Sequence, residues 1–206
     1  MSTFLNEKDA VSNVLGRTDG ATANTIRDNL INEVRQSDIA NSYPFSWLEK
    51  SVALTTSSGV DDLPSDYNIN HSPRAVYDAN GNQYVQVNKE TWELNNQSYI
   101  YFIDYNTSTH LWRINTKDDV ALTMIYYHIP ATLTGDSDID IIPDLKLIKY
   151  FVAAEYWLSS ERDEANHDRF QVLADRRLKD LIDQDKKARP LRSRRGSIYT
   201  VDMGFN

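Results

Sequence analysis

Hydrophobic side chains recur with helical spacing at both ends of the chain and with strand spacing between them. The first pattern predicts a short helix over residues 6–15, which Gly16 ends because glycine readily adopts the left-handed conformation found after helices. A second, amphipathic helix is predicted from about residue 22 to Asn41, followed by Phe45 and Trp47 as anchors in the core. Its apolar face contains Ile26, Leu30, Ile31 and Val34, and its solvent face contains Arg27, Asp28, Glu33 and Arg35.

Between residues 50 and 130 the apolar residues alternate with polar ones, which is the period of a half-buried strand. Asn80-Gly81 separates two such runs, 74–77 and 83–87, and predicts a hairpin because this dipeptide adopts the positive φ of a tight turn. We therefore expect a small antiparallel sheet in the middle of the chain. Its strands are predicted over residues 51–56, 74–77, 83–87, 99–105, 110–114 and 120–128.

The last third of the sequence has helical spacing again. Pro143 suits the first position of a helix, and a charged helix follows that extends to about Lys187. One continuous helix over this length would span roughly 68 Å, too long for a compact domain. We therefore expect a break near residues 159–163, and Pro190 to end the second helix.

These elements together predict an α+β fold. It consists of a bundle of about four helices, namely a short N-terminal helix, a long helix and two C-terminal helices, with an antiparallel β insertion at about residues 50–130. We expect residues 1–188 to form a single domain and residues 189–206 to form an extended C-terminal tail that binds a partner.

Charge divides the chain unevenly. The net charge is −8, yet residues 186–206 contain six cations and one acid, so the rest of the chain carries −13. An acidic body argues against a domain that reads nucleic-acid sequence, which normally presents a basic face. The sequence has no apolar stretch of about 18 residues and no basic leader, so we expect a protein that is neither exported nor inserted in a membrane.

The sequence contains no recognisable catalytic or cofactor-binding motif. It has no cysteine, its four histidines are far apart, and its seven glycines form no phosphate-binding pattern. Asp136, Asp138 and Asp140 have the spacing that opens a calcium loop, but Ile141 and Leu147 stand where that loop needs glycine and glutamate. We predict a solvated acidic loop here, and a protein that is not an enzyme and has no metal or cofactor.

The C-terminal tail is the candidate binding segment. Its basic run could bind phosphates, dock on an acidic protein surface or form a solvated end. The apolar residues that follow favour a segment that becomes ordered on a partner protein. The residues predicted to bind are Arg189, Arg192, Arg194, Arg195, Ile198, Tyr199, Val201 and Phe205.

Several stretches, taken in order, resemble the head-to-tail connector (adaptor) proteins of tailed bacteriophages, including the tail-tube adaptors of short-tailed phages. They are VLGR at 14–17, TIRDNLINEV at 25–34, FSWL at 45–48, LPSDY at 63–67 and IIPDL at 141–145, followed by the helices predicted over 147–158 and 163–181. The resemblance covers most of the chain and is weakest over residues 68–118.

The resemblance implies a structural virion protein in the phage neck, made in the host bacterial cytoplasm. It implies a dodecameric ring of copies below the portal that joins the capsid vertex to the tail. The partners would be the portal protein and tail or nozzle proteins, and DNA would pass through the channel without sequence-specific binding. The acidic body suits such a channel, because acidic walls repel phosphates.

An alternative of another class is a carbohydrate-binding or hydrolytic tail component that uses the aromatic residues of the predicted sheet. Aromatic residues at alternating strand positions are more commonly core pairs than sugar platforms. The residues concerned are Tyr99, Tyr101, Tyr105, Tyr126 and Tyr127.

Overall fold

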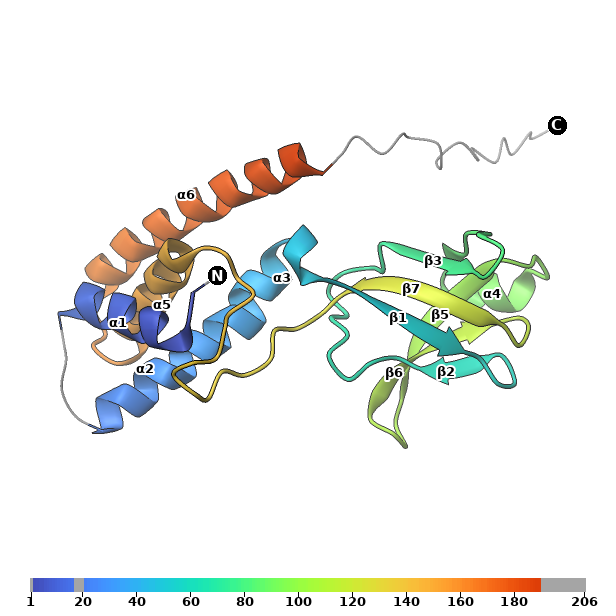
Figure 1. The fold of residues 1–206 in the computed structure, drawn as a ribbon, viewed down its shortest axis with the longest axis horizontal. Coiled ribbons are helices and arrows are strands. Elements are labelled where there is room, and N and C mark those ends of the chain that lie inside the picture. The colour runs from blue at the N-terminus through green and yellow to red at the C-terminus, as the bar shows by residue number, and fades with distance from the viewer. Residues whose placement is uncertain (1, 17–20, 190–206) are drawn as a thin grey trace.

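The computed structural model describes residues 2–16 and 21–189, which form two lobes placed end to end (Figure 1). The helical lobe contains α1 (Phe4–Leu15), α2 (Ala21–Glu33), the π-helical turn η1 (Val34–Ile39), α3 (Ala40–Ser42), α5 (Leu145–Ser159) and α6 (Glu164–Ala188). The β lobe contains β1 (Glu49–Thr55), β2 (Val60–Asp62), β3 (Ala75–Asp78), β4 (Val85–Gln86), α4 (Lys89–Leu94), β5 (Ile100–Asn106), β6 (Leu111–Thr116) and β7 (Ala121–Tyr127). The short 3-10 turn η2 (Ser46–Leu48) joins the lobes.

The predicted α+β fold class is confirmed, and the local signals explain where the helices begin and end. Gly16 closes α1 with a φ of 64°. The predicted break between the last two helices lies between α5 and α6, where the side chain of Asp163 accepts the Asn166 N–H at 3.0 Å and caps α6. Pro143 was predicted to be the first residue of α5, and this is wrong. Asp144 caps that helix by accepting the Leu147 N–H at 2.7 Å, so Pro143 lies just outside it.

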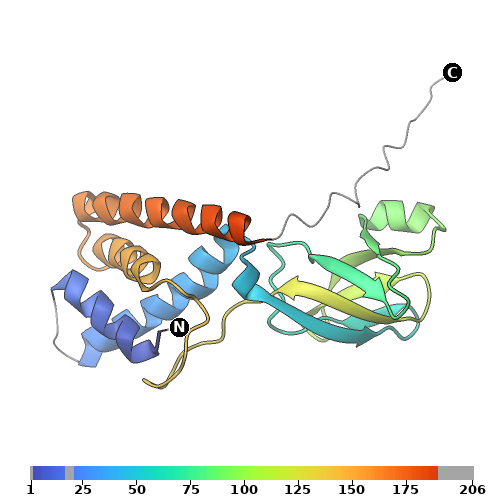
Figure 2. The same ribbon diagram turned by 45° about the horizontal axis from the view of Figure 1, so that its top comes forward.

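In the helical lobe, α1 and α2 from the first part of the chain pack against α5, which in turn packs against α6. In Figure 2, α6 runs along the outside of α5 toward the β lobe. Phe45 is fully buried in the same core and Trp47 packs against it, which confirms their predicted role as anchors. The fully buried positions come from both halves of the lobe and include Val11, Ile31, Val34, Ile148, Val152 and Ala174.

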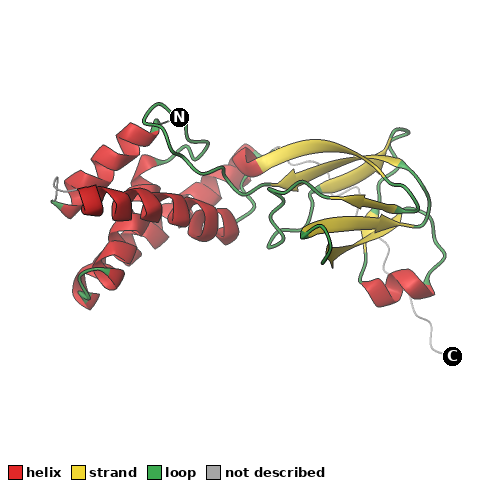
Figure 3. Cartoon of the chain, turned by 90° about the horizontal axis from the view of Figure 1, so that it is seen from below, coloured by secondary structure: helices red, strands yellow, loops and turns green. Residues whose placement is uncertain are grey.

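The predicted single sheet is wrong in detail, because the β lobe consists of two sheets that face each other (Figure 3). One has the strand order β1-β7-β3 and is antiparallel. The other has the order β2-β6-β5-β4, and its β4–β5 pair is parallel. Their inner faces bury a second core of Leu54, Leu63, Tyr67, Val76, Tyr101, Ile114, Leu122, Met124 and Tyr126.

The predicted hairpin forms only at its turn. Gly81 has a φ of 83°, and the carboxylate of Asp78 accepts the N–H groups of Asn80 and Asn82, each at 2.9 Å. Beyond the bridge between Tyr77 and Gln83, however, the chain leaves β3 and pairs with β5 in the second sheet. The turn residues therefore fixed the reversal but not the partner of the second strand. Helix α4, capped by Asn88, was not predicted.

Buried charges close the helical lobe, and Arg35 is the exception to the predicted solvent face of the second helix. Arg35 lies four residues after the buried Ile31, on the same face of the helix, where it is 1 % exposed and pairs with the fully buried Asp140 at 2.5 Å. Its other terminal nitrogen donates to the Ala131 carbonyl at 3.1 Å. Arg35 thus binds the segment that returns from the β lobe. Asp140 was predicted to lie in a solvated loop. It is instead fully buried in the core.

Glu7 of α1 is the third fully buried ionisable group here. Its carboxylate accepts the Ser2 hydroxyl at 2.9 Å. Burial raises the pKa of Glu7 to about 8, with a further contribution from the negative charge of Asp140 and an opposing one from Arg35. Near neutral pH, a protonated Glu7 leaves Arg35 and Asp140 as a balanced ion pair. Deprotonation adds a second negative charge to a site with one cation.

We predict that this site makes stability depend on pH. Because the pKa of Glu7 is near 8 when folded and about 4.3 when unfolded, the folded state holds a proton that the unfolded state has lost. The free energy of unfolding should therefore fall by about 1 kcal/mol per pH unit between these two values. Urea unfolding of wild type and Glu7→Gln from pH 5 to pH 9 measures this. The glutamine variant should become more stable relative to wild type as pH rises.

The matched control is Asp9→Asn, which removes an exposed carboxylate from the same helix. It should follow the wild-type curve at every pH. A constant difference between Glu7→Gln and wild type over the whole range would contradict the protonation of Glu7.

A second prediction concerns the turn between β1 and β2. Gly59 has a φ of 73°, and a Cβ atom there would lie 2.6 Å from the Thr116 carbonyl oxygen. Gly59→Ala should therefore lower the free energy of unfolding by more than about 2 kcal/mol. Gly81→Ala is the control, because its φ is 83° but nothing lies near the added atom. The free energy of unfolding of Gly81→Ala should fall by only about 1 kcal/mol. Equal losses in denaturant unfolding would contradict the close approach at Gly59.

Candidate partner-binding site at the lobe junction

The end of α6 is fixed to the start of the β lobe by a buried carboxylate. Asp185 is 7 % exposed, and its Oδ1 accepts both the backbone N–H of Ser46, at 3.1 Å, and the Ser46 hydroxyl. These bonds hold the first residue of η2, the turn that leads into β1. The last turn of the C-terminal helix is thereby connected to the point where the chain enters the sheets.

Arg189, the last described residue, completes the connection. Its guanidinium donates to the Pro44 carbonyl oxygen, and its Nε lies 2.8 Å from Asp185. The same group is 3.9 Å from Glu49 and 5.6 Å from the ring centre of Tyr43. Glu49 in turn pairs with Arg74 at the start of β3. We call the set Ser46, Glu49, Arg74, Asp185 and Arg189 the junction cluster.

Two further polar residues, Asn68 and His128, hold the lobes at this point. Asn68 is fully buried, and its amide donates to the Ala40 carbonyl at 3.1 Å, while its backbone N–H donates to the Tyr127 carbonyl at 3.0 Å. The backbone N–H of His128 donates to the Leu48 carbonyl at 2.9 Å. The crossing between the lobes is therefore hydrogen-bonded from both sides.

The structure locates one of the eight predicted binding residues. Arg189 lies in the junction cluster, where its acidic neighbours are Asp185 and Glu49 of its own chain. Its contact with a partner stays a prediction, and its observed contacts fix the point from which the tail extends. The other seven lie outside the described residues: Arg192, Arg194, Arg195, Ile198, Tyr199, Val201 and Phe205.

The sequence interpretation missed the rest of the junction cluster. Asp185 precedes Arg189 by four residues on a helix, a spacing that does predict an ion pair. Ser46 is 139 residues away from Asp185 along the chain, and no local pattern connects them. The contact follows only from the packing of α6 against the lobe entrance.

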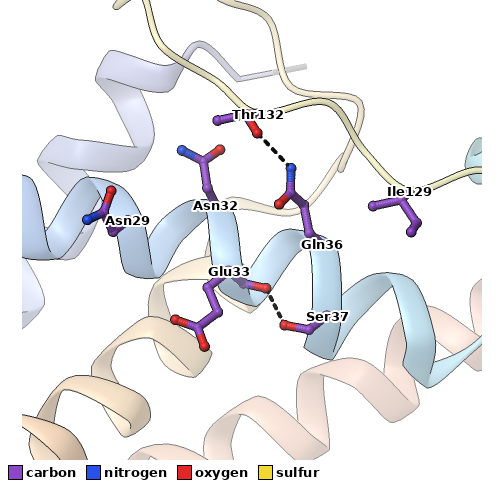
Figure 4. A pocket seen from close by; sticks show the side chains of 7 residues that line it. All are labelled: Asn29, Asn32, Glu33, Gln36, Ser37, Ile129 and Thr132. Carbon is purple, nitrogen blue, oxygen red and sulfur yellow. Dashed lines mark hydrogen bonds between the residues drawn. The ribbon is translucent and has the colours of Figure 1, made fainter. Parts of the chain in front are cut away.

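A shallow groove lies on the helical lobe, and polar side chains that line it hold the structure together (Figure 4). It lies between α2, η1 and the segment returning from the β lobe. The Asn32 side chain both donates to and accepts from the backbone of Leu133, at 3.0 and 2.8 Å. Gln36 donates to the Pro130 carbonyl and to the Thr132 hydroxyl, each at 3.0 Å. The side-chain amides of Asn32 and Gln36 therefore hold the segment that returns from the β lobe.

The acidic loop does not assemble a cation site. Asp136 pairs with Lys8 at 2.9 Å, and Asp138 accepts the N–H groups of Thr134 and Gly135 at 2.8 Å. Asp140 points into the core toward Arg35. Among the described residues, no group of three histidine, cysteine or acidic side chains could hold a metal ion. No helix within the described ranges is long and apolar enough to cross a membrane.

The aromatic platform required by the carbohydrate alternative does not form. Tyr101, Tyr126 and Tyr127 are at most 5 % exposed and belong to the cores. Tyr99 and Tyr105 are each 45 % exposed, at opposite ends of β5. Two separated tyrosines do not provide a continuous stacking surface for a sugar chain.

Comparison with protein families gives a match over nearly the whole chain. The model of the family described as SU10 adaptor protein matches residues 2–194, which include both lobes and the junction cluster. No curated protein matches the chain.

The junction geometry yields a prediction about Asp185. Asp185→Ala should lower the free energy of unfolding by about 1–3 kcal/mol, because it leaves the Ser46 N–H without its buried acceptor and the Arg189 guanidinium without its ion-pair partner. Asp183→Ala removes an exposed acid from the same helix and should change stability by less than about 0.5 kcal/mol. Guanidinium unfolding of both variants measures the difference. Equal effects would show that Asp185 does not fasten the junction.

Proposed function

Since the chain belongs to the SU10 adaptor protein family, we propose that it joins the capsid vertex of a tailed phage to the tail as a ring below the portal. The observation that carries this proposal is the family match over residues 2–194. The portal protein lies on one side of such a ring and tail or nozzle proteins on the other. DNA passes through its centre without sequence-specific contacts.

The outer face of α6 supports contacts between neighbouring copies. Arg169, Asp175, Arg176 and Asp180 are exposed on this helix, and they alternate in sign. Mixed exposed charges of this kind suit a polar, hydrated interface, in which charge pairing sets the register of the partners. The dodecameric number comes from the family resemblance. In such a ring the long helices line or build the wall, and the β lobe extends outward or toward the phage tail.

The two functional parts that we assign to the chain meet at the junction cluster. We assign residues 1–188 to a single structural domain and residues 189–206 to portal binding. Arg189 is fastened by Asp185 and Glu49, so the binding segment starts from a fixed point. The arginines that follow are suited to acidic groups of the portal or of a neighbouring copy, and the apolar residues to a groove.

A structural, non-enzymatic role agrees with the charge of the body. The chain outside the last 21 residues carries −13. Acidic walls repel DNA phosphates, so a channel lined by them allows DNA to slide without binding.

We predict that deleting residues 190–206 leaves the fold intact by circular dichroism but weakens portal binding at least about a hundredfold, because several desolvated contacts are lost together. Titration with the purified portal protein of the same phage measures the affinity. Replacing Arg192, Arg194 and Arg195 by glutamine in the full-length chain should weaken binding less and reduce its dependence on salt. If the truncated protein bound the portal with wild-type affinity, portal binding through residues 190–206 would be refuted.

A further inference from the structure

The two sheets of the β lobe leave a groove where β3 and β4 separate. Each of these strands is the last of its sheet within the part of the chain that the structure describes. The cavity between them has a volume of ≈ 440 Å³. Its lining comes from residues 72–76, which lead into β3, from residues 83–86, which lead into β4, and from Tyr101 of β5. We call it the β3–β4 groove.

The groove begins where a hydrogen-bonded ladder stops. The Asp78 N–H donates to the Asn82 carbonyl at 3.1 Å, and the Tyr84 N–H donates to the Val76 carbonyl at 2.8 Å. After Tyr84 the chain turns to β5, where the Val85 and Val87 N–H groups donate to the Tyr99 and Tyr101 carbonyls. The two backbones thus diverge from a paired turn, and each presents a strand edge to the space between them.

The groove also exposes apolar surface beside these edges. Val85 is 59 % exposed although it lies in a strand. Tyr84, which packs against the second core, lines the same space, and so does Tyr101, which is only 3 % exposed and adds little apolar surface. Edges of strands next to exposed apolar side chains suit an added strand, since the backbone bonds give affinity and alternate side chains find apolar contacts.

The C-terminal sequence has the pattern that such a site requires. Tyr199, Val201, Met203 and Phe205 alternate with Thr200, Asp202 and Gly204. This is a strand period in which one face is apolar and the other is polar except for Ile198. Its residues Ile198, Tyr199, Thr200 and Val201 also have high strand propensity.

The described chain ends next to the groove. Arg189 contacts Glu49, and Glu49 pairs with Arg74, which lines the β3–β4 groove. The eight residues from 190 to 197 can span roughly 27 Å when extended. A segment tethered this closely has an effective concentration near the millimolar range, so its own groove is favoured over that of another molecule.

We propose that residues 198–205 of this chain add a strand to its own β3–β4 groove in the unassembled subunit. This goes beyond the proposed function, which concerns the assembled ring. It implies that the portal competes for a segment that is already bound, so that the apolar residues are covered until assembly.

Hydrogen exchange of the free subunit tests the proposal without any portal. Backbone amides of residues 72–77 and 84–88 should exchange about tenfold more slowly in the full-length protein than in a protein ending at residue 197. Amides of β2, at the far edge of the second sheet, should exchange equally in both. Equal exchange at the groove in the two proteins would overturn the proposal.

Two single variants and a dilution series complete the experiment. Val201→Asp, on the apolar face of the segment, should remove the protection, whereas Thr200→Asp on its polar face should retain it. Protection should be the same over a hundredfold range of protein concentration. Identical behaviour of the two variants would exclude an added strand, and protection that increases with concentration would show that a second copy is the occupant.

Discussion

The helical lobe has to be closed by a chain that leaves it through η2 and returns over residues 129–144, and the buried Arg35–Asp140 pair holds the returning segment in place. Both side chains are at most 1 % exposed. A buried pair of this kind is strongly destabilising when one partner is removed, although it adds little net stability compared with apolar residues. Its value here is positional. With Arg35 bound to Ala131 and Asp140, the returning segment has one register, and α5 starts where it can meet α1 and α2.

The lobe junction follows from that constraint. Since α5 and α6 are fixed against the first half of the bundle, the end of α6 arrives beside the entrance to the sheets. Asp185 then holds Ser46, and Arg189 holds Pro44 and Glu49. The same contacts that fix the two lobes also fix the origin of the C-terminal segment. Fold and proposed portal binding therefore share one set of residues.

The sequence predicted what is local and missed what is not. The helix stop at Gly16, the break before α6 and the reversal at Asn80-Gly81 depend on a few adjacent residues, and the structure confirms them. Arg35 was assigned to the solvent face because it is charged, but it lies four residues after Ile31 and shares the buried face, where Asp140 neutralises it. The pairing of β4 with β5 could not be predicted, since a turn fixes a reversal but not the strand that follows it. Of the candidate site, the sequence indicated the tail and Arg189, whereas Ser46, Glu49 and Arg74 depend on tertiary packing.

The proposed ring between portal and phage tail can be tested by a cryo-EM reconstruction of the full-length protein bound to the portal protein of the same phage. The proposal predicts a closed ring of copies below the portal, with neighbouring copies in contact through α6 and residues 190–206 ordered against the portal. A reconstruction in which the portal carries no bound ring, with the protein left as free subunits at saturating concentration, would contradict it.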